Sequence, residues 1–415
     1  MTMRLVTATA MAAVLAAQLS FGFQGARPVD PVTAWSVAAQ SAAASSGMAP
    51  LRIPITLALV HLAMYDAVHA IVGERKPYHP GLAVMRPASA EAAAIEAGYR
   101  IALAEMPSQS AALGAKRDEW LASVPAGTDK TNGIAVGAAT AQRLLALRAY
   151  DGRNAAVPFT PSGEDGAWVP TPPAFLPATT TFLAHITPFT MDAPWQFRPS
   201  GPPPLDSKRW ARDYNEVKAL GVRVGSQRSG EQTATALFWE PLAGTVWPAT
   251  IRRLAAEQFL DLPASAHFQA AAFAAFADSL IACWDAKFHF QFWRPVTAIQ
   301  HGDQDGNPQT APDPVWEPLA VTPNFSEYPS GHTCATAAVA QVIEDYFPHG
   351  VQIPARNVVT GEDRLYRKAS DIVDEVIEAR MLLGVHFRSG NEDGADVGRK
   401  VARQIRSRWF ERRGS

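Results

Sequence analysis

Cysteine is scarce in this sequence. The 415 residues contain two cysteines, Cys283 and Cys334, so at most one disulfide can form within the chain. In an exported protein that disulfide would tie the flanking segments together. Two buried free thiols are the alternative, because the sequence does not give the distance between the two side chains.

An excess of charge of either sign is also lacking. Lys and Arg number 37, Asp and Glu number 39, and the net charge is −2. This near neutrality argues against nucleic acid as a partner. Hydrophobic residues make up 47% of the chain, which is ample for a large core, and the length suggests two or three domains.

Strand signals are sparse, since alternating β-branched runs are absent and no short repeat is visible. Helical patterns dominate instead, and the sequence predicts an all-α protein made of two packed helical bundles. We expect an N-terminal helical region over 27–205 and a C-terminal bundle over 206–415. Helices are predicted at 51–72, 88–106, 129–149, 206–222, 230–240, 250–262, 266–294, 330–347, 366–384 and 392–412.

Between residues 150 and 205 the helical pattern gives way to Pro, Thr, Gly and aromatic residues. Phe182, Phe189, Trp195 and Phe197 need burial, so this stretch is predicted to be a long structured crossover rather than a flexible linker.

Two segments raise the question of a membrane. Residues 51–72 are long and apolar enough to span one, but the embedded His61, Asp66 and His69 favour a buried core helix, so no stable membrane insertion is expected. Residues 1–26 have one early charge followed by an apolar stretch, which predicts a secretory signal peptide and export to the periplasm or beyond. An N-terminal membrane anchor is the alternative.

Three short motifs in the C-terminal half carry the chemistry. They read Lys287-x6-Arg294-Pro295, Pro329-Ser330-Gly331-His332 and Arg380-x5-His386. Together they supply three cations, two imidazoles, a hydroxyl and a glycine N–H. This set of groups can hold a tetrahedral or trigonal-bipyramidal oxyanion.

The local structure of each motif can also be predicted. The spacing of Lys287 and Arg294 places both on one face of a helix that ends near Pro295. Ser330 is expected to cap a helix whose N-terminus binds anions, and Gly384 is expected to end a helix just before His386. Taken singly, each motif also has an ordinary structural explanation, such as charged side chains on a solvent-exposed helix face or a core histidine with its hydrogen bonds made.

The order of these motifs resembles the superfamily of vanadium-dependent haloperoxidases and type 2 phosphatidic acid phosphatases (PAP2), whose pattern is K-x6-RP, PSGH and SR-x5-H-x3-D. The stretches WRPVTAI, TPNFSEYPSGH and GVHFR, with HLAMYDAVHAI and TPF-x3-APW in the first half, resemble the bacterial haloperoxidase-like branch. The resemblance implies a helical fold with its active site in the C-terminal bundle.

The resemblance also implies roles for individual residues. Vanadate, or phosphate in a phosphatase, would be the bound group, and His332 would be the acid–base imidazole. His386 would be the ligand to vanadium or the nucleophile that forms a phosphohistidine. The oxygens of the bound group would be held by Lys287, Arg294, Ser330, Gly331 and Arg380.

The chain departs from this pattern at two positions. Ala379 stands where the pattern has Ser, and Gly390 stands where it has the Asp that orients the histidine. Glu392, Asp393 or a backbone carbonyl is expected to take over that role.

Three functions are compatible with these observations. The first is a vanadium-dependent haloperoxidase that acts on hydrogen peroxide and a halide. The second is a secreted acid phosphatase that acts on phosphate esters, and the third is an exported protein that binds the anion without turnover. A homo-oligomer is compatible with a long helical exterior.

Overall fold

The computed structural model describes residues 30–412, except 83, 85 and 242. The predicted signal peptide at 1–26 lies outside the described residues. Within them the chain is helical, with one small antiparallel hairpin formed by β1 (Ile353–Arg356) and β2 (Asp363–Tyr366). The all-α prediction is confirmed.

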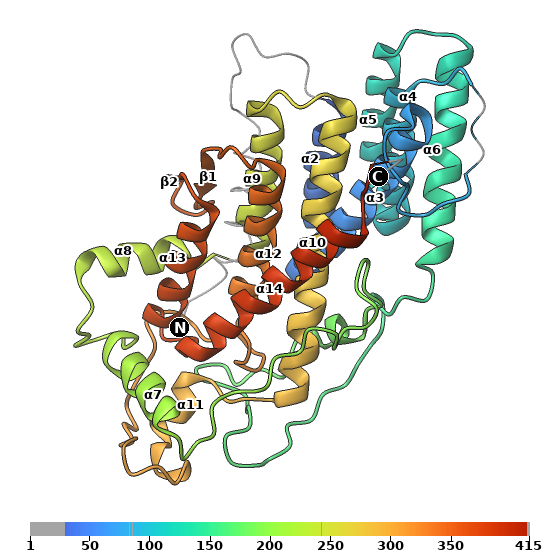
Figure 1. The fold of residues 1–415 in the computed structure, drawn as a ribbon. Coiled ribbons are helices and arrows are strands. Elements are labelled where there is room, and N and C mark those ends of the chain that lie inside the picture. Colours follow the sequence, from blue (N-terminus) through green and yellow to red (C-terminus); the bar gives the residue numbers. More distant parts are fainter. Residues whose placement is uncertain (1–29, 83, 85, 242, 413–415) are drawn as a thin grey trace, which may run out of the picture.

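The longest helix, α10 (Leu262–Phe290), lies at the centre of the molecule (Figure 1). It begins where the Asp261 carboxylate accepts the Ala264 N–H at 2.9 Å, with a proline in the first turn. Its residues are buried on every face, which is typical of a core helix. It ends at Gln291, whose φ of 49° is left-handed.

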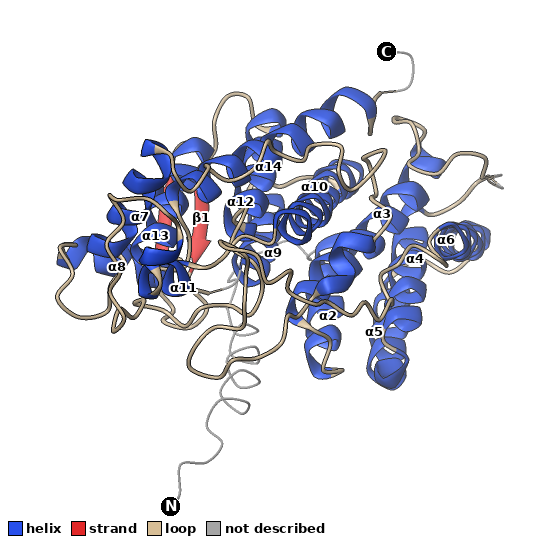
Figure 2. Cartoon of the chain, turned by 90° about the horizontal axis from the view of Figure 1, so that it is seen from below, coloured by secondary structure: helices blue, strands red, loops and turns tan. Residues whose placement is uncertain are grey.

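Helices of the N-terminal half pack on one side of α10 and helices of the C-terminal half pack on the other (Figure 2). The first group is α2 (Pro31–Ser45), α3 (Ile53–Val72), α4 (Ala90–Glu105), α5 (Ser110–Ser123) and α6 (Thr128–Leu147). The second group is α7 (Lys208–Leu220), α8 (Gly230–Phe238), α9 (Ala243–Glu257), α11 (Pro295–Gln300), α12 (Gly331–Tyr346), α13 (Ala369–Leu382) and α14 (Arg388–Arg408). Short 3-10 turns lie at Pro50–Arg52, Pro107–Gln109, Thr181–His185 and Gly302–Gln304.

One hydrophobic cluster runs through both groups of helices, from Val32 on α2 to Phe410 after α14. The helix α10 contacts α3 on one side and α12 on the other, and so belongs to the core of both. A second cluster, around Trp210 and Trp316, lies under α7 and α11.

The crossover at 150–205 is a structured loop, as predicted (Figure 1). The Asp278 carboxylate on α10 accepts the N–H groups of Phe189 and Thr190, both at 2.7 Å, which fixes the loop to the core helix. Phe189 is buried, but the prediction that Trp195 is buried is wrong, since 60% of its surface is exposed.

Among the described residues, two helical stretches are long and apolar enough to cross a membrane: Pro50–Val72 and Leu262–Phe290. Their most apolar windows are 89% and 94% buried inside the protein. Both are therefore core helices of this fold, as the histidines within residues 51–72 indicate.

Candidate active site

Lys287 lies in the last turn of α10 with its side chain fully buried. Its ammonium donates to two backbone carbonyls, those of Ser326 at 2.9 Å and Glu327 at 2.8 Å. Burial lowers the pKa of Lys287 to about 8 even though Glu327 lies nearby. Burying a cation costs free energy unless the charge is paired, so this position favours the binding of an anion.

Arg294 is not on α10, so the prediction that one helix face carries both cations is wrong. The helix stops at Gln291, and residues 291–293 bond to residues 166–168 of the crossover. Pro295 keeps Arg294 extended, with ψ of 155°. Its guanidinium nevertheless returns to the site, where Nε donates to the Phe325 carbonyl at 2.8 Å and Nη1 to the Val385 carbonyl at 2.7 Å.

The second motif forms the start of α12. Ser330 occupies the N-cap position, as predicted, but its hydroxyl makes no capping bond. Its Oγ is buried and has no hydrogen-bond partner in the described part of the chain. Gly331 follows because a Cβ there would lie 2.8 Å from the Trp284 ring. The N-terminus of α12 thus brings a free hydroxyl and a bare backbone to the site.

His332, in the first turn of α12, has its Nε2 3.2 Å from the Pro241 carbonyl. Because a carbonyl can only accept, Nε2 carries the proton and Nδ1 has the free lone pair. Burial and the nearby Arg380 hold the pKa of His332 well below its usual range. The imidazole is therefore neutral and can accept a proton.

The third motif spans the end of α13 and the loop after it. Arg380 lies in the last turn, and α13 ends before Gly384, whose φ is 74°, as predicted. The Arg380 side chain is 3% exposed, and its pKa falls to about 9 through burial and the repulsion of Arg294. His386 then follows in the loop, with its Nε2 3.2 Å from Arg294 Nη1.

Neither Glu392 nor Asp393 replaces the aspartate that the pattern has at 390. Asp393 accepts the Tyr328 hydroxyl at 2.6 Å, and Glu392 lies 3.8 Å from Arg209. The partner of His386 Nδ1 is the buried carboxylate of Glu327, at 2.8 Å. This residue lies 59 positions away in the sequence, and the signal that could have revealed it is a carboxylate next to the second motif.

The structure therefore brings the predicted site residues to one place. The pKa of His386 is held well below its usual range by burial and then by Arg294, Lys287, Arg380 and His332. Several buried donors lack a partner among the described residues: Arg294 Nη2, Arg380 Nε and Ser330 Oγ. Three buried cations, one buried carboxylate and these unpaired donors fit a small oxyanion in charge and in hydrogen bonding.

The two cysteines are buried free thiols, which decides between the two alternatives that the sequence leaves open. Cys283 lies one turn before Lys287 on α10 and donates to the Pro329 carbonyl, with Sγ 3.4 Å from the oxygen. Cys334 lies on α12, so the pair sits where these two helices meet.

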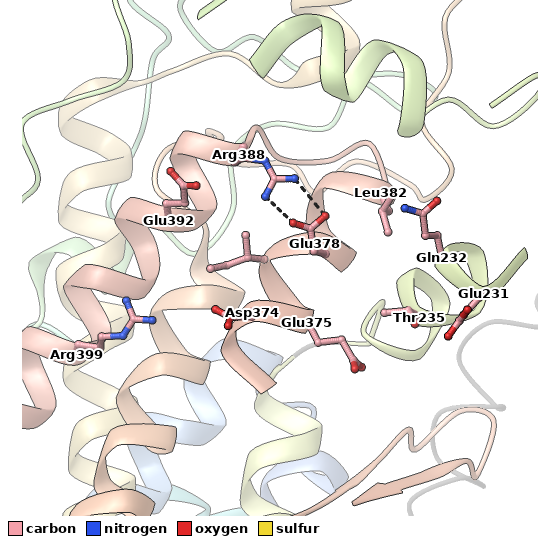
Figure 3. Close-up of a pocket in the computed structure, with 11 residues that line it drawn as sticks. Glu231, Gln232, Thr235, Asp374, Glu375, Glu378, Leu382, Arg388, Glu392 and Arg399 are labelled. Atoms are coloured by element: carbon pink, nitrogen blue, oxygen red, sulfur yellow. Dashed lines mark hydrogen bonds and ion pairs between the residues drawn. The ribbon is translucent and has the colours of Figure 1, made fainter. Parts of the chain in front are cut away.

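A separate acidic groove of about 630 Å³ lies between α8, α13 and α14 (Figure 3). Its carboxylates come from Glu231, Asp374, Glu375, Glu378 and Glu392. Arg388 points into it and pairs with Glu378 at 2.5 Å and with Glu216 at 2.6 Å. Of the described residues that line this groove, none is a proposed site residue, although Leu382 lies between Arg380 and His386.

Comparison with known proteins places this chain among similar sequences and folds. Residues 267–412 match the family model of the VCPO second helical-bundle domain. The vanadium chloroperoxidase of Curvularia inaequalis is 29% identical over 169 residues, which cover 32% of this chain. This chain covers 27% of that relative's length.

Solved structures extend the likeness to both bundles. The first bacterial vanadium-dependent iodoperoxidase superposes with a TM-score of 0.77 at 23% identity, covering 93% of this chain and 99% of its own. A holo-type bacterial vanadium-dependent chloroperoxidase gives a TM-score of 0.65 at 18% identity, covering 87% and 92%. At these identities the likeness establishes a shared fold.

Proposed function

Because residues 267–412 match the family model of the VCPO second helical-bundle domain, we propose that this protein is a vanadium-dependent haloperoxidase that oxidises halide ions with hydrogen peroxide. One observation carries the proposal. Three buried cations and several unpaired donors surround a histidine whose second nitrogen is fixed by a buried carboxylate. Export is part of the proposal and rests on the sequence of residues 1–26.

Vanadate would be held by the residues that the motifs supply. Lys287, Arg294 and Arg380 would balance its negative charge, while Ser330 Oγ and the Gly331 N–H would donate hydrogen bonds to its oxygens. When bound, vanadate supplies an electron-poor centre that makes peroxide reactive toward a halide. The burial of the cations strengthens each of these interactions, because water does not screen them.

His386 is prepared to act as a ligand. Its Nδ1–H donates a hydrogen bond to Glu327 Oε1, so Nε2 has a lone pair that faces Arg294. Its pKa is held far below the usual range, which keeps the ring neutral at physiological pH. A neutral imidazole with a fixed tautomer is the form that binds a metal centre.

His332 is prepared to move a proton. Its Nε2–H is engaged by the Pro241 carbonyl, which leaves Nδ1 to accept a proton from an incoming hydroxyl or hydroperoxyl group. Burial and then the surrounding cations lower the pKa of His332 and disfavour the imidazolium, so the proton would be held briefly and passed on. His332 would therefore serve as a base first and as an acid afterwards.

A secreted acid phosphatase of the PAP2 type is the second candidate, and the His386–Glu327 contact favours it as much as the first. A neutral, oriented His386 could attack the phosphorus of a phosphate ester and form a phosphohistidine, with His332 protonating the leaving oxygen. Gly390 does not argue against this candidate, because a carboxylate is already present.

One experiment separates these functions. Purified protein is given orthovanadate, hydrogen peroxide and bromide, and bromination of a phenolic dye is followed, with His386→Ala as the matched control. A parallel assay without vanadate follows hydrolysis of a phosphate ester. Bromination that requires vanadate and His386 supports the haloperoxidase. Ester hydrolysis that vanadate inhibits, without bromination, would make the protein a phosphatase. The absence of both activities would favour an anion-binding protein.

A further inference from the structure

Glu327 connects all three motifs. Its N–H donates to the Phe292 carbonyl at 2.9 Å, two residues before Arg294, and its own carbonyl accepts the Lys287 ammonium at 2.8 Å. Its carboxylate Oε1 lies 2.8 Å from His386 Nδ1 and accepts the Phe387 N–H at 3.1 Å. The residue itself lies three positions before Ser330 and is fully buried. Its backbone is bonded to the first motif and its side chain to the third, and it directly precedes the second.

Gly390 is the steric counterpart of Glu327. A Cβ built on Gly390 would lie 2.8 Å from Glu327 Oε2 and 3.0 Å from Cδ, and closer still to Oε1. Any side chain at 390 would therefore collide with the carboxylate that binds His386. The glycine has an ordinary helical conformation in α14, so its backbone torsions do not require it.

We propose that Glu327 is the positioning residue for His386. It supplies the orienting carboxylate that the motif pattern has at position 390, and Gly390 leaves the space that this carboxylate occupies. The carboxylate reaches the histidine from the loop before α12 instead of from the first turn of α14. The inference rests on the proposed oxyanion site and adds to it a residue that none of the three motifs contains.

The position of the carboxylate has a mechanical consequence. In the exchanged arrangement the residue that orients His386 is bonded through its backbone to Lys287 and Phe292. The ligand histidine and the first cation are therefore fixed relative to one another by one residue. A carboxylate on α14 would orient His386 without that link.

Vanadate binding, measured by calorimetry, tests the proposal. Glu327→Ala should weaken binding by about 10- to 100-fold, the usual effect of removing a carboxylate behind a metal-bound histidine. Glu327→Gln keeps the size of the side chain and should weaken binding in the same direction while the protein stays folded. Gly390→Asp alone should lower the melting temperature, because the two side chains compete for one space.

The decisive variant is the double exchange, Glu327→Ala with Gly390→Asp. It should recover at least about tenfold of the affinity that Glu327→Ala loses. Asp393→Asn is the matched control, since it removes a nearby carboxylate on α14 that contacts Tyr328, and it should bind vanadate as the unchanged protein does.

The outcomes separate this inference from the proposed function. If the unchanged protein binds vanadate and Glu327→Gln binds it equally well, the positioning role is refuted while the oxyanion site stands. A double variant no better than Glu327→Ala would refute the exchange. If the unchanged protein binds no vanadate, both the proposed function and this inference are overturned.

Discussion

At the scale of single residues, Ser330 shows how the proposed binding site would come at the expense of stability. Its hydroxyl is fully buried at a helix N-terminus, yet it makes no bond to the N–H groups of that helix, and within the described residues it has no partner. A buried hydroxyl without a partner costs free energy, and here the cost keeps a donor available for an oxyanion.

Ser330→Ala should therefore act on stability and binding in opposite directions. Removing the unpaired hydroxyl should stabilise the anion-free protein by about 1 kcal/mol, since an unsatisfied buried group is lost. Oxyanion affinity should fall about tenfold, because one hydrogen bond to a charged ligand is lost. Thermal unfolding without anion and calorimetry with vanadate measure the two effects. A variant that is less stable than the unchanged protein would show that Ser330 Oγ has a structural partner.

Lys287 gives the site a pH dependence of known sign. Its pKa is lowered to about 8 by burial, so the ammonium loses its proton, and the site one positive charge, as pH rises through that value. The affinity for an anion should be full below pH 8 and should fall by about tenfold per unit above it. Tungstate, which stays a dianion across this range, is the suitable probe for calorimetry between pH 7 and pH 9.5.

The control for this prediction is Lys287→Arg, because arginine keeps its charge through the same range. Its affinity should change much less with pH, whatever its absolute value. A slope that is equally steep in Lys287→Arg would assign the pH dependence to another group, such as Arg380, whose pKa is lowered to about 9.

The residue types of the site could be predicted from sequence, whereas their contacts could not. The motifs name Lys287, Arg294 and His386, because cations and imidazoles at fixed spacing carry the chemistry. Glu327 was missed as the partner of His386, since only tertiary folding brings residues 59 positions apart together. In the sequence, Gly390 indicates only that the orienting aspartate is missing. In the structure, the absence of a side chain at 390 leaves room for the Glu327 carboxylate.

At the scale of elements, the closeness of α14 to α12 controls the site. Two glycines on α14 make this approach possible. A Cβ on Gly394 would lie 2.7 Å from the Ser330 carbonyl oxygen, and one on Gly398 would lie 2.8 Å from the Ala338 backbone nitrogen. Gly394 thus faces Ser330, which is proposed to bind the anion, and Gly398 faces α12 one turn further along.

Alanine at these two glycines should separate stability from binding. Each substitution forces the helices apart and should cost about 1–3 kcal/mol, as overpacking does in a dense core. Gly394→Ala should also weaken vanadate binding, since it displaces Ser330, whereas Gly398→Ala should leave the affinity close to that of the unchanged protein. Melting temperature and calorimetry on both variants provide the test. Equal losses of affinity would show that the helix spacing, and not Ser330, is what matters.

Helix ends show where prediction from sequence stops. The pattern over 266–294 is helical to its last residue, but the chain leaves the helix at Gln291 because residues 291–293 bond to the crossover. A local pattern cannot report a partner more than a hundred residues away. Helices at 31–45 and 110–123 were also missed, whereas the positive φ of Gly384 was predicted because a glycine signals a helix end by itself.

At the scale of the whole molecule, a protein of net charge −2 contains a buried cluster of three cations. The formal charge of the chain gives no hint of this, because charges of opposite sign elsewhere cancel it. The cluster lies at the C-terminal end of α10, the helix that both bundles share. The repulsion between the three cations therefore acts on a helix that belongs to both cores.

An oxyanion that relieves this repulsion should stabilise the whole protein. A ligand that binds only the folded state at 100 times its dissociation constant adds about 2.7 kcal/mol to the free energy of unfolding. Vanadate or phosphate should therefore raise the melting temperature, while sodium chloride at equal ionic strength should not. Arg380→Ala should show a much smaller rise, and an unchanged melting temperature in the presence of either oxyanion would contradict a binding site at the core.

The two thiols can report how often the packing between α10 and α12 opens. Cys283 and Cys334 have no exposed surface and lie where α10 and α12 meet, so an alkylating reagent can reach them only when these helices part. The rate of alkylation then measures how often α10 and α12 separate, and no additional cysteine has to be introduced. Lys287 lies on α10 and Ser330 lies at the start of α12. A bound oxyanion should therefore slow the alkylation of the two thiols, and removing the oxyanion should make it faster.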